Sequence, residues 1–178
     1  MSIQTCKGQN EEKIRVSSIL SAYNINSSNI LYKNEIDFDN NGKVDYILVC
    51  KKDGSNTNDL LIIKNDNNGY SVVLENKDAI PCEDCGNGAE SFYDYRVDNK
   101  SLSFTSSYKS NEDIYMIEFE FINDAKNIYV LNKATVNKSK IGESIETKAI
   151  LNNKNFGIII LKNFNYSSFL SKYILNKD

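Results

Sequence analysis

The stretch of sequence that decides the fold is IDFDNNGKVDYILVCKK, residues 36–52. Its first half carries five oxygen donors at nearly alternate positions: Asp37, Asp39, Asn41, the backbone carbonyl of Lys43, and Asp45. Side chains spaced in this way turn several oxygens inward, and Gly42 permits the sharp turn between them. The second half, YILVCKK at 46–52, is an apolar run of strand length. We therefore predict a tight, oxygen-rich loop that leads directly into a β-strand.

Two interpretations of this loop stay open. Oxygens at this spacing suit a hard cation, and Ca²⁺ is the natural candidate. The loop departs from an EF-hand, because its twelfth position is Leu48 rather than a glutamate and because a strand, not a helix, follows it. Alternatively, the Asn41-Gly42 pair makes good turn chemistry by itself, and the loop is an Asx-rich turn that binds nothing.

The chain that follows is organised as three sequential hairpins. The paired runs are LLIIKN (60–65) with YSVVLEN (70–76), YDYRV (93–97) with SLSFTSS (101–107), and YMIEFEFIN (115–123) with IYVLNKATV (128–136). Short polar turns such as DNNG separate them, and no crossover helix intervenes. A further strand is expected at 149–151. The predicted fold class is mainly β (α+β), an antiparallel meander of sequential hairpins.

Helices are expected at both ends of this meander. Residues 10–23 place their apolar side chains on one helical face, with Asn10 as the N-cap. Near the other end, FGIIILKNF at 156–164 predicts a buried strand. The tail to residue 178 then predicts an amphipathic helix that begins after Asn165 and packs on the sheet. We assign residues 1–178 to a single domain.

Composition excludes several classes of function. The chain of 178 residues has a net charge of −3 with charges of both signs interspersed, so it lacks the basic surface that nucleic acid requires. It contains no histidine, which removes His-dependent triads, His metal sites and His proton shuttles. No apolar run is long enough to span a membrane.

The four cysteines allow three pairings, and the sequence alone does not choose among them. Cys82 and Cys85 form the sequence CEDC, which we interpret as a disulfide that staples a loop. Unpaired structural thiols are the next alternative, and a redox or metal role is a third. The opening MSIQTCKGQN is interpreted as a mature N-terminus from which an export signal has been trimmed.

The sequence offers no set of catalytic residues. Glu118 and Glu120 stand on one face of a predicted strand, roughly 6–7 Å apart. A carboxylate pair can hydrolyse glycosides when it is aimed across a cleft, but alternate glutamates on a strand are typical of its solvated face. We therefore expect a protein that is not an enzyme.

The Asp-rich loop and the strand after it resemble the repeats of the FG-GAP and VCBS type found in integrin-like β-propellers. The stretch 37–137, with its acidic loop, its hairpins and the segment IPCEDCGNG at 80–88, also resembles a group of small exported bacterial proteins of obscure function. A propeller needs several such units. Only one good copy is present, so we expect a stand-alone domain that uses one such unit.

The resemblance implies metal ligands and a location but no reaction. By this analogy the ligand positions are Asp37, Asp39, Asn41, Lys43 and Asp45, the ion is Ca²⁺, and the protein is periplasmic or secreted. The leading hypothesis is a non-catalytic binding protein whose partner is another protein. Its sharper form is a periplasmic immunity protein that neutralises a secreted antibacterial toxin. The alternatives are a carboxylate-dependent cell-wall or carbohydrate hydrolase and a structural calcium-binding adhesion module.

Overall fold

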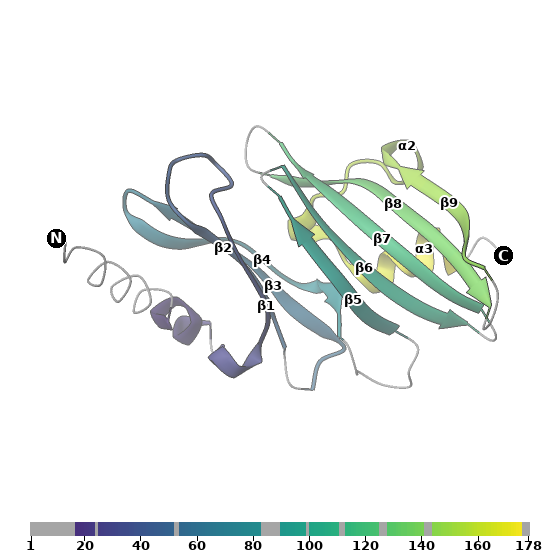
Figure 1. Ribbon diagram of the computed structural model, residues 1–178, viewed down its shortest axis with the longest axis horizontal. Helices are drawn as coiled ribbons and strands as arrows, with labels where there is room; N and C mark the ends of the chain where they lie inside the picture. The colour runs from purple at the N-terminus through teal and green to yellow at the C-terminus, as the bar shows by residue number, and fades with distance from the viewer. Residues whose placement is uncertain are drawn as a thin grey trace.

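The computed structural model describes residues 17–23, 25–51, 54–82, 90–98, 100–110, 113–124, 128–140 and 144–175. Nine strands within these ranges form two antiparallel sheets (Figure 1). The four-stranded sheet contains β1 (Ile30–Ile36), β2 (Asp45–Cys50), β3 (Thr57–Asp66) and β4 (Gly69–Pro81). The five-stranded sheet contains β5 (Glu90–Val97), β6 (Ser101–Ser110), β7 (Asp113–Asn123), β8 (Tyr129–Lys140) and β9 (Glu146–Asn152).

The predicted meander of sequential hairpins is confirmed. In each sheet the neighbouring strands are consecutive in the chain, in the orders β1-β2-β3-β4 and β5-β6-β7-β8-β9. The three predicted hairpins are β3–β4, β5–β6 and β7–β8, and the expected strand at 149–151 is part of β9. Two features were not predicted, namely strand β1 and the division of the meander into two sheets.

Both faces of the inner strand β2 are buried, which explains its unbroken apolar run. Ile47 and Val49 point into the main core between the sheets. Tyr46, Leu48 and Cys50 point to the other face, where a second apolar cluster includes Leu20. Leu20 lies in the helical segment 17–22. That segment is the described part of the predicted N-terminal helix, and the predicted cap at Asn10 lies outside the described residues.

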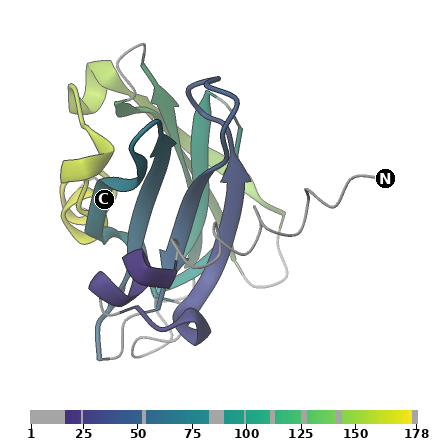
Figure 2. The ribbon, with the colours of Figure 1, turned by 90° about the vertical axis from the view of Figure 1, so that its left-hand side faces the viewer.

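The C-terminal segment fills the inner face of the five-stranded sheet. Strand β7 alternates as predicted, and its residues Ile117, Phe119 and Phe121 are fully buried. The centroid of the Phe119 ring lies 5.2 Å from the ring centroid of Phe164 and 5.3 Å from that of Phe169. Figure 2 shows this C-terminal segment beside β4, so that it packs against both sheets.

The expected buried strand at 156–164 is wrong. Helix α2 (Asn153–Phe156) is followed by Gly157, whose φ of 75° turns the chain away from it. Ile158 is 82% exposed. Only an isolated bridge between Ile160 and Val130 joins this segment to β8, because β9 already occupies the edge of β8 beyond it. The apolar run therefore becomes a loop and the short 3-10 turn η2 (Leu161–Asn163).

Helix α3 (Tyr166–Tyr173) is the predicted C-terminal amphipathic helix. Asn165 caps it as expected, because its Oδ1 accepts a hydrogen bond of 2.8 Å from the backbone amide of Ser168. Tyr166, Phe169 and Leu170 are its buried residues. A second 3-10 turn, η1 (Ser27–Asn29), precedes β1. Among the described helices, none is both long enough and apolar enough to cross a membrane.

Candidate metal centre

The Asp-rich stretch is the loop of the hairpin between β1 and β2. Ile36 and Asp45 are the last residues that pair across this hairpin, so residues 37–44 form its loop. The loop lies against the neighbouring β3–β4 turn. The Asn41 side-chain amide donates to the carbonyl of Asn65 at 2.9 Å, and the Lys43 ammonium donates to the carbonyl of Asp66 at 2.6 Å. Two loops of one sheet edge thus support each other.

Side-chain caps on backbone amides fold this loop. The carboxylate of Asp37 accepts hydrogen bonds from the amides of Asn41 and Gly42, at 2.9 and 2.7 Å. The Asn41 Oδ1 in turn accepts from the amide of Lys43 at 2.8 Å. Asn40 and Gly42 adopt the left-handed conformation, with φ of 56° and 79°, which asparagine and glycine tolerate best. The Asx-turn chemistry expected from the sequence is present.

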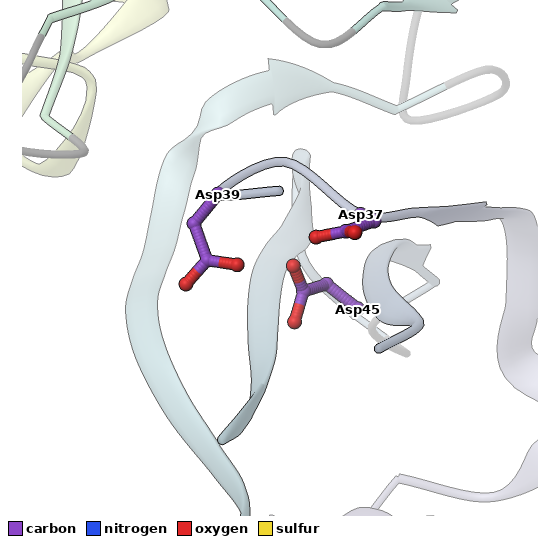
Figure 3. Close-up of side chains that lie close together, drawn as sticks. All are labelled: Asp37, Asp39 and Asp45. Carbon is purple, nitrogen blue, oxygen red and sulfur yellow. The ribbon is translucent and has the colours of Figure 1, made fainter. Parts of the chain in front are cut away.

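Three carboxylates converge inside the loop (Figure 3). One carboxylate oxygen each from Asp37, Asp39 and Asp45 lie within 4.8 Å of one another. Hard cations such as Ca²⁺ and Mg²⁺ are bound by oxygen sets of this kind. The three acidic positions predicted from the sequence are therefore brought together, from both ends of one loop.

Asp45 is the buried member of this group. Burial raises the pKa of its carboxyl, and the negative charges of Asp39 and Asp37 raise it further. Two backbone amides act in the opposite direction, because Asp45 accepts from Asn65 at 2.7 Å and from Phe38 at 3.2 Å. The carboxylate is thus held in place by two amides but repelled by its two acidic neighbours.

Asp39 already faces a cation of the protein itself. The ammonium of Lys64, on β3, lies 2.6 Å from its Oδ2. Burial raises the pKa of Asp39, but the hydrogen bond and charge of Lys64 and the hydrogen bonds of Asn41 outweigh this and leave it below its ordinary value. A metal ion on Asp39 would have to share it with Lys64 or displace that ammonium.

Lys64 is the residue of this site that the sequence analysis missed. The strands 46–52 and 60–65 were both predicted, and Tyr46 pairs with Ile63 in the sheet. That register brings Lys64 next to Asp45 at the end of the pair. The register between these two predicted strands would have placed Lys64 in the site. The sequence does not specify that register.

The side chains of Asn41 and Lys43, at the other two predicted ligand positions, contact other parts of the protein, and the Lys43 backbone carbonyl stays a predicted ligand. Asn41 uses its amide nitrogen on Asn65 and its oxygen on the Lys43 amide, as described above. The side chain of Lys43 points to the β3–β4 turn, where it also contacts Asn67 Oδ1 at 3.2 Å. The three carboxylates are the core of the candidate centre, and Asn41 and Lys43 fix the loop around it.

The predicted disulfide falls partly outside the described residues. Cys82 is buried just after β4, whereas Cys85 is not described. The Cys82–Cys85 pairing therefore stays a prediction. Cys50 is a free thiol within β2, and burial together with the charge of Asp59 raises its pKa to about 12.

The glutamates considered for catalysis lie on a strand face as expected. Glu118 and Glu120 lie on the face of β7 that points away from the core. Glu120 forms an ion pair of 3.4 Å with Lys133. Glu120 and Asp98 line one shallow hollow together. The amides of Lys100 and Ser101 lower the pKa of Asp98, so this carboxyl is held ionised as a turn cap. A glycosidase acid needs the opposite shift.

Comparisons of the chain with protein families, with curated proteins and with solved structures found no match.

Proposed function

We propose that this chain is a non-catalytic binding protein whose β1–β2 loop takes up one Ca²⁺ ion. The observation that carries the proposal is the convergence of the Asp37, Asp39 and Asp45 carboxylates within 4.8 Å. Lys64 balances one of these three negative charges. A divalent cation would balance the rest and relieve the repulsion that acts on the buried Asp45.

The ion would serve structure rather than chemistry. Asp37 and Asp39 belong to the start of the loop, and Asp45 begins β2. A cation held by all three would tie the two ends of the loop and fix its contacts with the β3–β4 turn. The alternative function, a structural calcium-binding adhesion module, would use the same ion. The hydrolase alternative gains no support from Asp98 and Glu120.

Thermal unfolding followed by circular dichroism tests the ion. An ion that binds only the folded state stabilises it by mass action. A dissociation constant of about 0.1–1 mM, as in extracellular calcium modules, gives about 1.4–2.7 kcal/mol in about 10 mM CaCl₂. For a domain of this size the melting temperature should rise by about 3–11 °C over its value in EDTA.

Two variants make this test specific to the loop. Asp39→Asn removes one charge from the cluster and should abolish most of the calcium response. Asp78→Asn removes the same charge from an exposed site on β4 and should keep the full response. Equal melting temperatures in EDTA and in CaCl₂ for the unaltered protein would refute calcium binding.

We further propose that the partner is another protein and that the chain is exported, in its sharper form as a periplasmic immunity protein. What supports a protein partner is the edge strand β9, which pairs only with β8 among the described strands. Ile145 and Ile150, beside and within it, are 62% and 60% exposed. Exposed apolar edge strands are places where a second chain can add a strand.

Co-purification with the product of the neighbouring gene tests the partner proposal. Ile150→Glu should weaken such a complex, whereas Ile122→Glu, on another exposed isoleucine of the five-stranded sheet, is the matched control. A neighbouring product with toxin activity that does not bind the chain would contradict the immunity role. This outcome is separate from the calcium test, which needs no partner.

A further inference from the structure

A cavity of about 220 Å³ lies between the four-stranded sheet and the C-terminal turn η2. Its walls come from four parts of the chain: the β1–β2 loop, the β3–β4 hairpin, the start of β8 and the segment 160–163. The buried side chains that line it are Phe38, Ile62, Leu74 and Tyr129. No part of the proposed function uses this cavity. Binding of a ligand in the cavity would not require the Ca²⁺ ion.

The inner part of the cavity suits a hydrocarbon or aromatic body. Its buried lining is made of aliphatic and aromatic side chains. Apolar cavities bind apolar molecules, and one of about 150 Å³ binds benzene. By that measure the present cavity would hold a body of about eight or nine carbon atoms.

The mouth of the cavity adds a positive charge. Val73 and Ile128, which are 48% and 37% exposed, form an apolar rim. Beside them lie Asn163 and Lys162, which is the charged residue of the lining. Lys162 is exposed and forms no ion pair with any residue that the structure describes. An unpaired ammonium at an apolar opening favours a ligand with one negative charge.

The backbone turn that carries Lys162 is fixed before any ligand arrives. Lys162 belongs to η2, and the buried Asn76 of β4 donates hydrogen bonds to the carbonyls of Leu161 and Phe164, on either side of Lys162. The turn that carries the ammonium is therefore fixed to the four-stranded sheet. A site that is already formed loses less entropy on binding.

The carboxylates of the nearby acidic loop converge on one another and on Lys64. Phe38 lines the cavity, while its neighbours Asp37 and Asp39 turn their carboxylates to the cluster with Asp45. Lys64 faces Asp39, and backbone amides cap the other two carboxylates. Lys64 pairs with one of these carboxylates, whereas Lys162 has no ion-pair partner among the described residues.

We propose that this cavity binds a small amphiphilic carboxylate. Its hydrocarbon or aromatic body, of about eight or nine carbons, lies among Phe38, Ile62 and Leu74, and its carboxylate lies on Lys162. Each methylene that enters the cavity should raise the affinity about fourfold, until the cavity is full.

A titration of the ¹⁵N-labelled full chain with sodium octanoate, followed by NMR, tests this site. Saturable shifts are expected for the amides of 128–131 and 160–163. Octanoate should bind more tightly than octylammonium, and acetate should not bind. In a series of carboxylates of increasing length, the affinity should level off when the hydrocarbon body, without the carboxylate, reaches about eight or nine carbons. No saturable shift with octanoate, or equal affinity for octylammonium, would overturn the proposal.

Three variants separate the charge from the cavity. Lys162→Gln should weaken the affinity for octanoate about fivefold. Lys154→Gln, which alters an exposed lysine of α2, should leave this affinity unchanged. Val73→Phe alters the exposed rim without disturbing the core and should block binding. Undiminished octanoate affinity in Lys162→Gln or in Val73→Phe would overturn the assignment, and shifts that persist elsewhere would mark adventitious binding.

Discussion

Replacement of Asn76 by leucine should loosen the C-terminal turn from the four-stranded sheet. Asn76 is only 5% exposed. Its amide nitrogen donates to the Leu161 carbonyl at 2.5 Å and to the Phe164 carbonyl at 2.8 Å, and its Oδ1 accepts from the amide of Asp78 at 2.7 Å. Leucine has a similar size but can form none of these three hydrogen bonds.

The magnitude follows from the groups that would be left without partners. The Phe164 carbonyl lies at a buried residue and would lose its Asn76 partner, and an unsatisfied buried group lowers the free energy of unfolding by about 1–3 kcal/mol. The Leu161 carbonyl still accepts from the Phe164 amide at 3.2 Å, so its lost hydrogen bond costs about 0.5–1.5 kcal/mol. The amide of Asp78 is partly exposed, so water can replace its partner. We expect a loss of about 2–4 kcal/mol in Asn76→Leu, a large part of the roughly 5–15 kcal/mol that holds a typical domain together.

Urea unfolding followed by far-UV circular dichroism measures this loss. The midpoint should fall while the slope stays unchanged. Asn132→Leu is the matched control, because it removes one exposed hydrogen bond, to Glu120, and should change stability by less than about 0.5 kcal/mol. A loss below about 1 kcal/mol in Asn76→Leu would refute the argument that this side chain anchors the turn.

Four further measurements follow from single groups. The Tyr129 hydroxyl is buried and forms no hydrogen bond within the described part of the chain, so Tyr129→Phe should raise the free energy of unfolding by about 1 kcal/mol in urea titrations. Because the pKa of Cys50 is raised to about 12, this thiol should resist a thiol reagent at pH 8 until the protein unfolds, as peptide mass spectrometry would show. Asn165→Ala removes the cap of α3 and should lower the free energy of unfolding by about 1 kcal/mol, measured in urea. Burial holds the pKa of Asp45 above its ordinary 3.8, so in EDTA the folded state binds more protons, and this carboxyl should make the protein less stable as the pH rises through that pKa. Urea titrations of Asp45→Asn across this range should lack that part of the pH dependence, and an unchanged profile would contradict the raised pKa.

The local part of this structure could be predicted from the sequence. Alternation in 115–123 placed Ile117, Phe119 and Phe121 on one buried face, and the DNNG turn set the β3–β4 hairpin. Asn165 was predicted as a helix cap because asparagine directly before a run of helical spacing is a typical N-cap residue. Each of these features depends on residues that are close in the chain, where periodicity and turn chemistry act directly.

The candidate site could be predicted only in part. The spacing of Asp37, Asp39 and Asp45 indicated a converging group, because one short loop carries all three. Lys64 could not be predicted, since it reaches Asp39 only through the register between β2 and β3. A shift of that register by one residue would turn Lys64 to the opposite face of the sheet.

The sequence by itself determined the hairpins, the end helices and the acidic turn of this protein. Tertiary structure alone decided that the meander divides into two sheets and that the run 156–164 becomes an anchored turn rather than a strand. It also decided that Phe38 and Lys162 line one cavity. The physical reason is that propensity and turn chemistry act between neighbours in the chain. Burial, in contrast, depends on which distant side chains together fill the space between the sheets.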